Sequence, residues 1–388
     1  MNLIEQIEWA GVVGCGGAGF PTHRKLKGSF EYFIANGAEC EPCLRHDRWL
    51  MKNKAREIVQ AMDAVCRELS IPHAVIALKD HYKEEAEALE AAISAEGSSV
   101  TLCRMDSFYP AGDEMACVYE VTGRIVPPAG IPAAVGAVVD NVATIYAIWE
   151  AMQGIPFTRK YLTVTGEVNR PSVLHVPVGT PLAKCIELAG GEKDGDHLIL
   201  TGGPMMGIPV PAEKLADAAV TKTTGGILVL SRDSYHGTAP DVRRMLSRAR
   251  SACIQCTTCS QLCPRHMLGH PLQPHMIMRK MAVAGTLDDI RNRLDDPVLQ
   301  TASLCCECGI CEVYACPMGL NPRRINGIIK GELRNAGFRW QNPEGAFFEA
   351  HPEREMRKAP TDKVAARAGV YRYNKVEELP FLEYDPGQ

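Results

Sequence analysis

The chain has 388 residues, 46% of them hydrophobic, and a formal net charge of -4. This length allows two or three domains with a large core, and the charge argues against a nucleic-acid partner. The start, MNLIEQIEWAGVVG, lacks the basic and apolar regions of a signal peptide. The most apolar stretch, 130–152, contains Asp140, Asn141 and several glycines, so we expect no membrane span and a cytoplasmic location.

Predicted helices and strands alternate through the first part of the chain. Residues 2–10, the stretch 55–69 and the charged, Ala-rich HYKEEAEALEAAISAE have helical patterns. The apolar runs in YFIANGAECEP, HAVIALKD and SVTLCRM read as short strands. This alternation predicts an α/β domain with a parallel sheet over residues 1–156.

A smaller α+β module is predicted over residues 157–236. KYLTVTGEV alternates apolar and polar residues as a half-buried strand does, and TPLAKCIELAGG reads as a short helix closed by glycine. HLILTGGPMMG and GGILVLSRD are further strands with glycine turns. A cysteine-rich region follows over 237–338, and the polar tail, 339–388, is expected to wrap over the surface or to form a link.

Nine of the sixteen cysteines fall in two short clusters, a pattern that indicates metal ligation in a cytosolic chain. CIQCTTCSQLCP and CCECGICEVYACP each contain a CxxCxxC triple followed by a Cys-Pro. By analogy with two-cluster ferredoxins, the fourth cysteine of each motif ligates the other cluster. One predicted [4Fe-4S] set is therefore Cys253, Cys256, Cys259 and Cys316, and the other is Cys305, Cys308, Cys311 and Cys263.

Zinc is the alternative, but it has no use for a triple followed by Cys-Pro. Cys306 could replace Cys305 as a ligand, although only Cys305 keeps the two-residue spacing. The gap between the motifs contains PHMIMRKMAVAG and TLDDIRNRL, which predict a helical ferredoxin domain instead of a β-hairpin type. Two such clusters transfer single electrons.

The glycine stretch GVVGCGGAGFPTHRKL contains Gly14-x-Gly16-x-x-Gly19, which matches the dinucleotide-binding fingerprint. That fingerprint needs a preceding strand and a helix that starts within it, whereas the residues upstream look helical and Pro21 follows the last glycine. A different phosphate cradle and a plain turn are the other two interpretations.

The longer phrases GCGGAGFPTHRK, NGAECEP, YPAGDE and DNVAT are more specific than the glycines. They resemble the flavin- and NADH-binding subunit of respiratory complex I and, more closely, the C subunit of the Rnf electron-transport complex. With VYEVTGRIVP, GGPMMG, VTKTT and CECGICEVYACPMGLNPRRIN, the resemblance extends over nearly the whole chain to the cobalamin reductases of propanediol-utilisation microcompartments.

This resemblance implies a complex I 51 kDa-like FMN/NADH-binding domain, an SLBB β-grasp module, in which GGPMMG is a structural turn, and the helical double [4Fe-4S] ferredoxin domain. It also implies roles for particular residues. The glycine loop and its flanks would hold FMN and NADH, Lys25 would contact the flavin phosphate, and Asn141 and Thr144 would grip the phosphate side. The implied cofactor-binding set is Gly14, Gly16, Gly17, Gly19, Phe20, Thr22, Lys25, Asn36, Glu39, Glu41, Gly112, Asp113, Glu114, Asn141 and Thr144.

No side chain is expected to act as an acid or base in hydride transfer, although Glu39 and Glu114 would lie near the flavin and nicotinamide. The implied reaction carries electrons from NADH through FMN and two clusters to a corrinoid, from cob(III)alamin towards cob(I)alamin. The alternatives are an Rnf-like protein that serves a ferredoxin or flavodoxin and a non-enzymatic iron–sulfur carrier. Microcompartment shell proteins or cobalamin enzymes are further possible partners, inside or at the shell.

This chain departs from the family in three respects. Cys15 stands where complex I relatives carry arginine, and Ala38 stands where they carry an acid. The sequence stops at FLEYDPGQ, before the C-terminal barrel-sandwich module that we expect from the cobalamin reductases.

Overall fold

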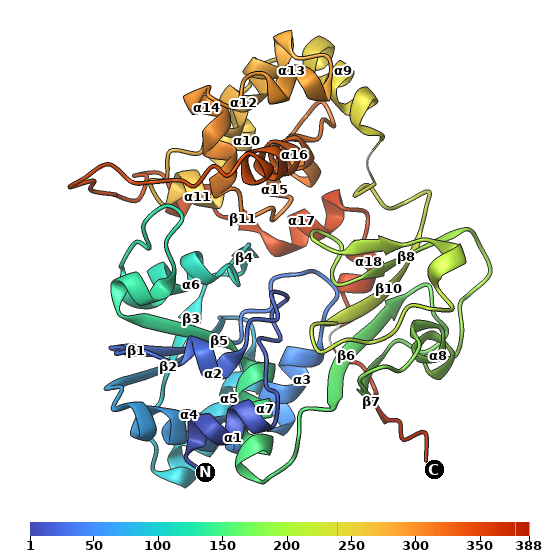
Figure 1. Ribbon diagram of the computed structural model, residues 1–388. Coiled ribbons are helices and arrows are strands. Elements are labelled where there is room, and N and C mark those ends of the chain that lie inside the picture. The colour runs from blue at the N-terminus through green and yellow to red at the C-terminus, as the bar shows by residue number, and fades with distance from the viewer. Residues whose placement is uncertain (239, 377, 388) are drawn as a thin grey trace.

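The computed structural model describes residues 1–238, 240–376 and 378–387. Figure 1 shows three domains and a tail: the N-terminal α/β domain at the bottom, a β-sheet module to its right and a helical module above both. The tail, drawn in orange-red to red, runs back between the three domains.

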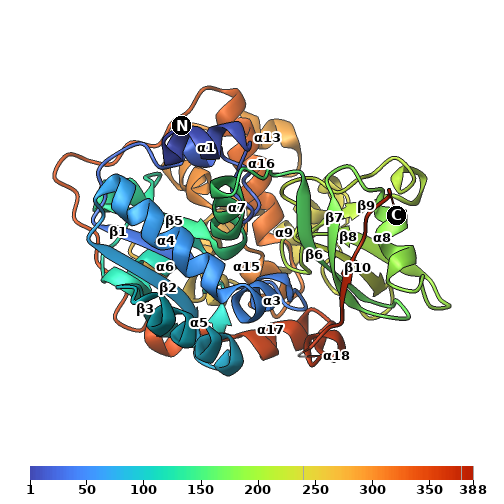
Figure 2. The same cartoon turned by 90° about the horizontal axis from the view of Figure 1, so that it is seen from below.

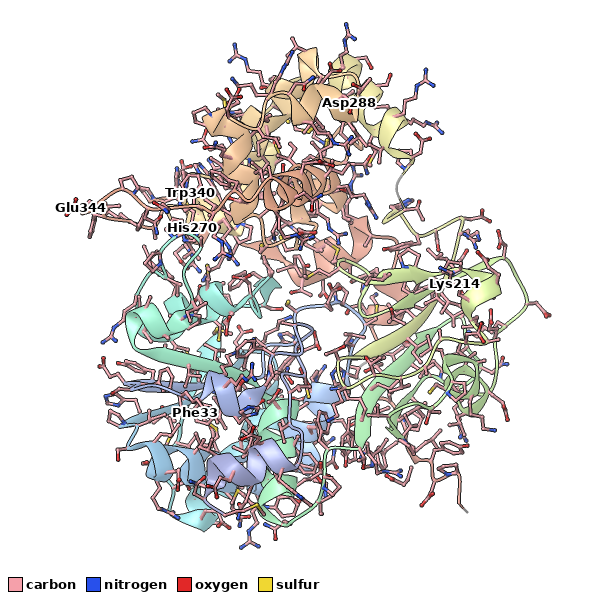
Figure 3. All side chains as sticks on the ribbon, in the orientation of Figure 1. Phe33, Lys214, His270, Asp288, Trp340 and Glu344 are labelled. Carbon is pink, nitrogen blue, oxygen red and sulfur yellow. The ribbon has the colours of Figure 1, made fainter. Side chains whose placement is uncertain are left out.

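The N-terminal domain is built on a parallel sheet in the order β3-β2-β1-β5. Phe33 is fully buried in the middle of this sheet and lies inside the domain in Figure 3. The strands are β1 (Tyr32–Asn36), β2 (His73–Lys79), β3 (Thr101–Met105) and β5 (Ala137–Asn141), with a short β4 (Phe108–Tyr109) outside the sheet. The helices are α1 (Leu3–Trp9), α2 (Thr22–Lys25), α3 (His46–Asn53), α4 (Ala55–Leu69), α5 (Lys83–Glu96), α6 (Glu114–Thr122) and α7 (Val142–Met152).

The predicted parallel α/β sheet and its first three strands are confirmed. Helix α4 forms because its apolar residues recur on one face and bury Ile58, Met62 and Val65 against the sheet. The chain leaves β1 on one side to reach β2, whereas β5 pairs on the other side of β1. A crevice at the carboxyl ends of such diverging strands is where open α/β sheets bind ligands.

The second domain is a mixed sheet in the order β12-β7-β6-β10-β8-β9, with one main helix, α8 (Leu182–Leu188), on its face. Its own strands are β6 (Arg159–Gly166), β7 (Ser172–Pro177), β8 (His197–Thr201), β9 (Ile208–Val210) and β10 (Gly226–Ser231). The half-buried pattern predicted for KYLTVTGEV was wrong, because all of β6 after Arg159 is buried. Its polar face is covered by the first domain, where Thr163 Oγ1 accepts hydrogen bonds from the backbone N–H groups of Arg45 and His46.

The third domain contains only helices among the described residues from 240 to 338, so the helical ferredoxin type is confirmed. PHMIMRKMAVAG forms α12 and the 3₁₀ turn after it, which bury Ile277, Met278 and Met281 as core. The helices are α9 (Val242–Ala252), α10 (Thr258–Gln261), α11 (Pro264–Met267), α12 (Pro274–Lys280), α13 (Leu287–Arg291), α14 (Pro297–Gln300), α15 (Ile310–Val313) and α16 (Pro322–Asn335). Across the described parts of the chain, no helix has both the length and the hydropathy to cross a bilayer.

The tail folds into the other domains and does more than wrap over them. β11 (Ala359–Pro360) pairs with β4 of the first domain, and β12 (Phe381–Glu383) extends the sheet of the second by pairing with β7. Between them lie α17 (Thr361–Arg367) and α18 (Tyr371–Asn374), which contribute Val364 and Tyr373 to a core that also includes residues of all three domains. Seen from below, the last residues run beside the second domain (Figure 2).

Candidate flavin and cluster sites

The glycine loop is a closed turn that projects to solvent between α1 and α2. Val13 and Pro21 form an isolated bridge, and the Gly14 N–H donates to the Phe20 carbonyl at 2.9 Å. Gly17 and Gly19 have φ values of +116° and +64°, which favour glycine. The following helix, α2, has only four residues. The strand before the loop and the long helix after it that define the dinucleotide fingerprint are therefore not present here.

The loop lies against the carboxyl ends of β1 and β5. Asn36 and Asn141, the last residues of these strands, are paired in register. The Cys15 N–H donates to Thr144 Oγ1 at 2.9 Å, and Asn141 caps α7 by accepting from the Ala143 N–H at 2.9 Å. The structure therefore brings the glycine loop together with the start of α7, where helix N–H groups favour an anion.

Lys25 reaches this crevice from α2. Its Nζ lies 2.8 Å from Glu114 Oε1 and 3.6 Å from Asp140 Oδ1, and it also donates to the Val139 carbonyl. Burial opposes the charge, but Asp140 and Glu114 raise the pKa of Lys25 above its usual value. Burial also raises the pKa of Asp140 to about 6.

Two buried oxygens beside Lys25 lack a hydrogen-bond partner, namely Thr22 Oγ1 and Asp140 Oδ2. Buried polar atoms normally have partners, so a polar ligand at this crevice would satisfy them. The Thr22 hydroxyl, the Lys25 cation and the exposed residues 16–18 of the glycine loop fit the phosphate end of FMN, whereas Asp140 Oδ2 can only accept a hydrogen bond and needs a donor group of a ligand. Phe20 is 53% exposed beside the loop.

Gly112 is held in position by contacts with residues at the end of β1. Its carbonyl accepts from Asn36 Nδ2 at 2.9 Å, and a Cβ at Gly112 would lie 2.8 Å from the Ala38 carbonyl oxygen. Only glycine permits this approach of the two backbones. Asn36 at the end of β1, Gly112 and the start of α6 at Glu114 therefore lie close together, and their contact with a flavin stays a prediction.

Glu39 and Glu41 follow β1 but have different surroundings. Burial and the nearby Asp47 raise the pKa of Glu39 to about 8. Glu41 accepts hydrogen bonds from the Met205 and Met206 N–H groups at 2.9 and 2.8 Å, and burial raises its pKa to about 7. The structure thus places Glu41 against the GGPMMG turn of the second domain, with both carboxylate oxygens engaged.

Asp113 also contacts another domain. Its two oxygens lie 2.5 and 2.8 Å from the guanidinium of Arg265 in a bidentate pair, and Oδ1 also caps α6 by accepting from the Met115 and Ala116 N–H groups. Arg265 follows Cys263 by two residues, so this pair joins the flavin crevice to the ferredoxin domain. Glu114 is therefore the acid of the Asp113-Glu114 pair that faces Lys25.

Three residues that the sequence analysis did not select complete these contacts. Asp47 accepts from Asn141 Nδ2 at 2.7 Å, Arg265 binds Asp113, and Tyr109 donates its hydroxyl to the Cys308 carbonyl. YPAGDE contains Tyr109, and its apolar setting was a signal that could have marked the residue as buried.

The predicted cysteine sets lie around two separate hollows in the ferredoxin domain. We call them the outer and the inner cavity. The outer cavity, about 340 Å³ including its opening, is lined by Cys253, Cys256, Cys259 and Cys316. The inner cavity, about 280 Å³, is lined by Cys263, Cys305, Cys308 and Cys311, with Cys306 beside them. The outer cavity has four lining thiols and the inner cavity has five, none in a disulfide, so each offers the four donors that an iron–sulfur cluster needs.

The two cysteine loops bend alike. Gln255 and Thr257, on either side of Cys256, have φ values of +54° and +65°; Glu307 and Gly309, on either side of Cys308, have +58° and +82°. A positive φ costs free energy in residues other than glycine. Its repetition at both loops indicates that each loop is bent in the same way to wrap around one centre.

Cys306 stays an alternative to Cys305. Cys305 Sγ accepts from the Glu307 N–H at 3.4 Å and lies 3.8 Å from Asn326 Nδ2. A hydrogen bond with Cys308, together with the nearby Arg265, lowers the pKa of Cys306 to about 7. Both thiols line the inner cavity.

Three family descriptions match this chain in the order of its domains. The Nuo51 FMN-binding domain matches residues 7–150, the SLBB domain matches 161–209, and the 4Fe-4S dicluster domain matches 252–321. The dicluster match favours iron–sulfur clusters over zinc. The expected class of each domain is therefore confirmed.

Curated relatives and solved structures agree with these matches. The chain is 39% identical to cobalamin reductase PduS of Salmonella typhimurium and of Citrobacter freundii, over 99% of this chain and 82% of each relative. It is 34% identical to the C subunit of the proton-translocating ferredoxin:NAD(+) oxidoreductase complex of Clostridium ljungdahlii, over 69% of this chain and 56% of that protein. An NAD+-reducing [NiFe]-hydrogenase in the H2-reduced state shares the fold, with a TM-score of 0.56 at 21% identity over 89% of this chain and 69% of the other.

Proposed function

The chain belongs to the PduS cobalamin reductase family, and on this premise we propose that it is an NADH-dependent oxidoreductase that reduces a corrinoid. FMN, when bound, takes a hydride from NADH and releases electrons singly to iron–sulfur clusters, which pass them on towards cobalamin. The observation that carries this proposal is that the glycine loop, Lys25 and Glu114 come together at the carboxyl ends of the paired strands β1 and β5.

The residues around the crevice divide into two groups. Lys25, Thr22 and the start of α7 are the proposed holders of the FMN phosphate, because they supply a cation, an unpaired hydroxyl and helix N–H groups. Asn36, Glu39 and Glu114 are proposed to orient the ring and the nicotinamide. Asp113 and Glu41 are proposed to hold the neighbouring domains in place instead of contacting FMN, because their oxygens bind Arg265 and the turn at Met205.

We propose that the cluster held in the inner cavity is the first to accept electrons from the flavin. Cys308, which lines this cavity, contacts the flavin domain because its carbonyl accepts the Tyr109 hydroxyl, and Arg265, two residues after the lining residue Cys263, pairs with Asp113. The outer cavity is lined by ferredoxin-domain residues and has an exposed cysteine, Cys256, so it is the proposed exit. The proposed ligand sets are those predicted from the two motifs.

Anaerobic reconstitution tests the proposal. NADH should bleach the flavin absorbance of the holoprotein, and hydroxocobalamin should then be reduced in steady state. Lys25→Ala should lose FMN on gel filtration, since it removes the cation at the phosphate, whereas the exposed neighbour Lys27→Ala should retain it. Wild-type protein that binds FMN but is not bleached by NADH would refute the proposal.

The ferredoxin or flavodoxin alternative keeps the same chain of carriers and changes only the acceptor. The 34% identity to the Clostridium ljungdahlii relative favours it as second candidate. A higher specificity constant for ferredoxin than for hydroxocobalamin would support this alternative. Association with a microcompartment is proposed only from the family, and co-purification with shell proteins would test it.

A further inference from the structure

The opening of the outer cavity combines apolar residues with arginines. Ile254 is 61% exposed and Met318 is 38% exposed, and both line the cavity beside the exposed Cys256. Large exposed apolar side chains at such a point indicate a surface that another molecule covers. An electron can leave the outer cavity here without crossing another domain.

Arginines flank this opening on two sides. On α9, Arg248 donates to the Met318 carbonyl at 3.2 Å, and the exposed Arg244 lies one turn earlier on the same helical face. On α12, the exposed Arg279 lies one turn after His275, which lines the cavity. Asp241 is an acid close to this surface and caps the start of α9.

The charge of the ferredoxin domain differs from that of the rest of the chain. Residues 241–338 hold thirteen Lys and Arg against eight Asp and Glu, whereas the whole chain holds 42 against 46. The excess of positive charge is thus confined to the domain where electrons are proposed to leave. Local charge of one sign steers partners of the opposite sign and raises their rate of association.

We propose that this surface docks an acidic electron-accepting protein, which takes electrons from the outer cluster and carries them towards the corrinoid, whereas free hydroxocobalamin does not depend on this surface for its reduction. The inference rests on the proposed function for its supply of electrons. In the step at this surface one electron leaves the outer cluster and reduces the partner's acceptor by one, with no bond made or broken. Ile254 and Met318 would form the apolar centre of the interface, and Arg244 and Arg279 its charged rim.

The test uses anaerobic holoprotein with NADH and three acceptors: an acidic ferredoxin, basic cytochrome c and hydroxocobalamin. Reduction of ferredoxin should fall steeply as ionic strength rises, because salt screens exposed charges. In Arg244→Glu/Arg279→Glu, the kcat/KM for ferredoxin should fall about tenfold and the salt dependence should flatten or reverse, since rim charges act mainly on association. Titration calorimetry with oxidised ferredoxin should show the same weakening of binding without turnover.

Arg334→Glu is the matched control. Arg334 is exposed near the far end of α16, whereas Pro322, at the other end, lines the outer cavity. Twelve residues of helix separate them by about 18 Å. This variant should behave as wild type with all three acceptors.

Three results would overturn the inference: salt-independent reduction of ferredoxin, equal loss in Arg334→Glu and in the double variant, or saturable reduction of hydroxocobalamin that the double variant weakens as much as it weakens ferredoxin. The last result would make the free corrinoid the occupant. Bleaching of the flavin by NADH is scored separately in each variant. Its failure in wild type would count against the proposed function and not against the docking surface.

Discussion

The inner and outer cavities are built by the same motif but have different surroundings. Thr257 and Gly309 occupy equivalent left-handed positions after Cys256 and Cys308. A side chain is accommodated at Thr257, whereas a Cβ at Gly309 would lie 2.9 Å from the Met205 carbonyl of the SLBB domain. The loop at Cys308 is therefore adapted to contact between domains, and the loop at Cys256 is adapted to solvent.

Met205 makes further contacts between domains next to the inner cavity. Its N–H donates to Glu41 of the flavin domain, and its carbonyl lies 3.3 Å from Arg323 Nη1 of the ferredoxin domain. One residue of the SLBB turn therefore touches both redox domains beside the inner cavity. The SLBB turn thus adds a third contact to the direct ones that Arg265 and Tyr109 make between these two domains.

Substitution of one cysteine ligand at each cavity should show the largest difference between the two cavities in electron transfer. In Cys311→Ser, NADH should still bleach the flavin, but reduction of any acceptor should fall to background because the inner centre is lost. In Cys256→Ser, NADH should still reduce the inner cluster, which electron paramagnetic resonance would detect. Cys103→Ser, outside both cavities, is the control. Loss of the inner signal in Cys256→Ser alone would reverse the proposed order.

The pair of Asp113 and Arg265 should give the largest effect on stability. Both side chains are nearly buried, at 13% and 9% exposure, so Arg265→Ala leaves an unpaired carboxylate and should lower the free energy of unfolding by about 3–5 kcal/mol. Arg291→Ala, which breaks the exposed pair with Glu332, should cost far less, because water and salt screen that pair. Denaturant unfolding measures both. Equal costs would mean that the inner cavity is not anchored by this contact.

Glu41 makes the attachment to the SLBB turn dependent on pH. Its pKa is raised from 4.5 to about 7 in the folded protein, so between these values the folded state holds a proton that the unfolded chain has released. The free energy of unfolding should therefore fall as pH rises from 4.5 to 7, by at most about 3 kcal/mol at 1.4 kcal/mol per pKa unit. Glu41→Gln should show a flatter profile of melting temperature over this range. Parallel profiles would contradict the assignment.

The Tyr109 hydroxyl should have the smallest effect. Tyr109→Phe removes the hydrogen bond to the Cys308 carbonyl and should cost about 1 kcal/mol. The midpoint potential of the inner cluster should shift while that of the outer cluster stays constant, in an anaerobic redox titration followed by electron paramagnetic resonance. Tyr314→Phe, in the ferredoxin domain, provides a control. A shift of both midpoints would indicate general loosening.

The sequence could predict what depends on local spacing. The apolar runs gave the first three strands of the parallel sheet, and the cysteine spacing predicted the two sets that line the two cavities. The partners of Asp113, Tyr109 and Glu41 could not be predicted, because these contacts join residues 152, 199 and 164 positions apart. KYLTVTGEV misled for the same reason, since its polar face is buried by another domain. The sequence pattern of the tail is mostly polar because few of its residues are buried. Those few join a core to which all three domains contribute.

The tail also implies an order of assembly in time. β11 and β12 pair with β4 and β7, strands that the ribosome produces far earlier than these last residues. Contacts between such distant segments form slowly and late, because a long loop must close before they are gained. We therefore expect the pairings of β11 and β12 to form after the contacts within each domain. They then tie the first and second domains to one common segment of chain.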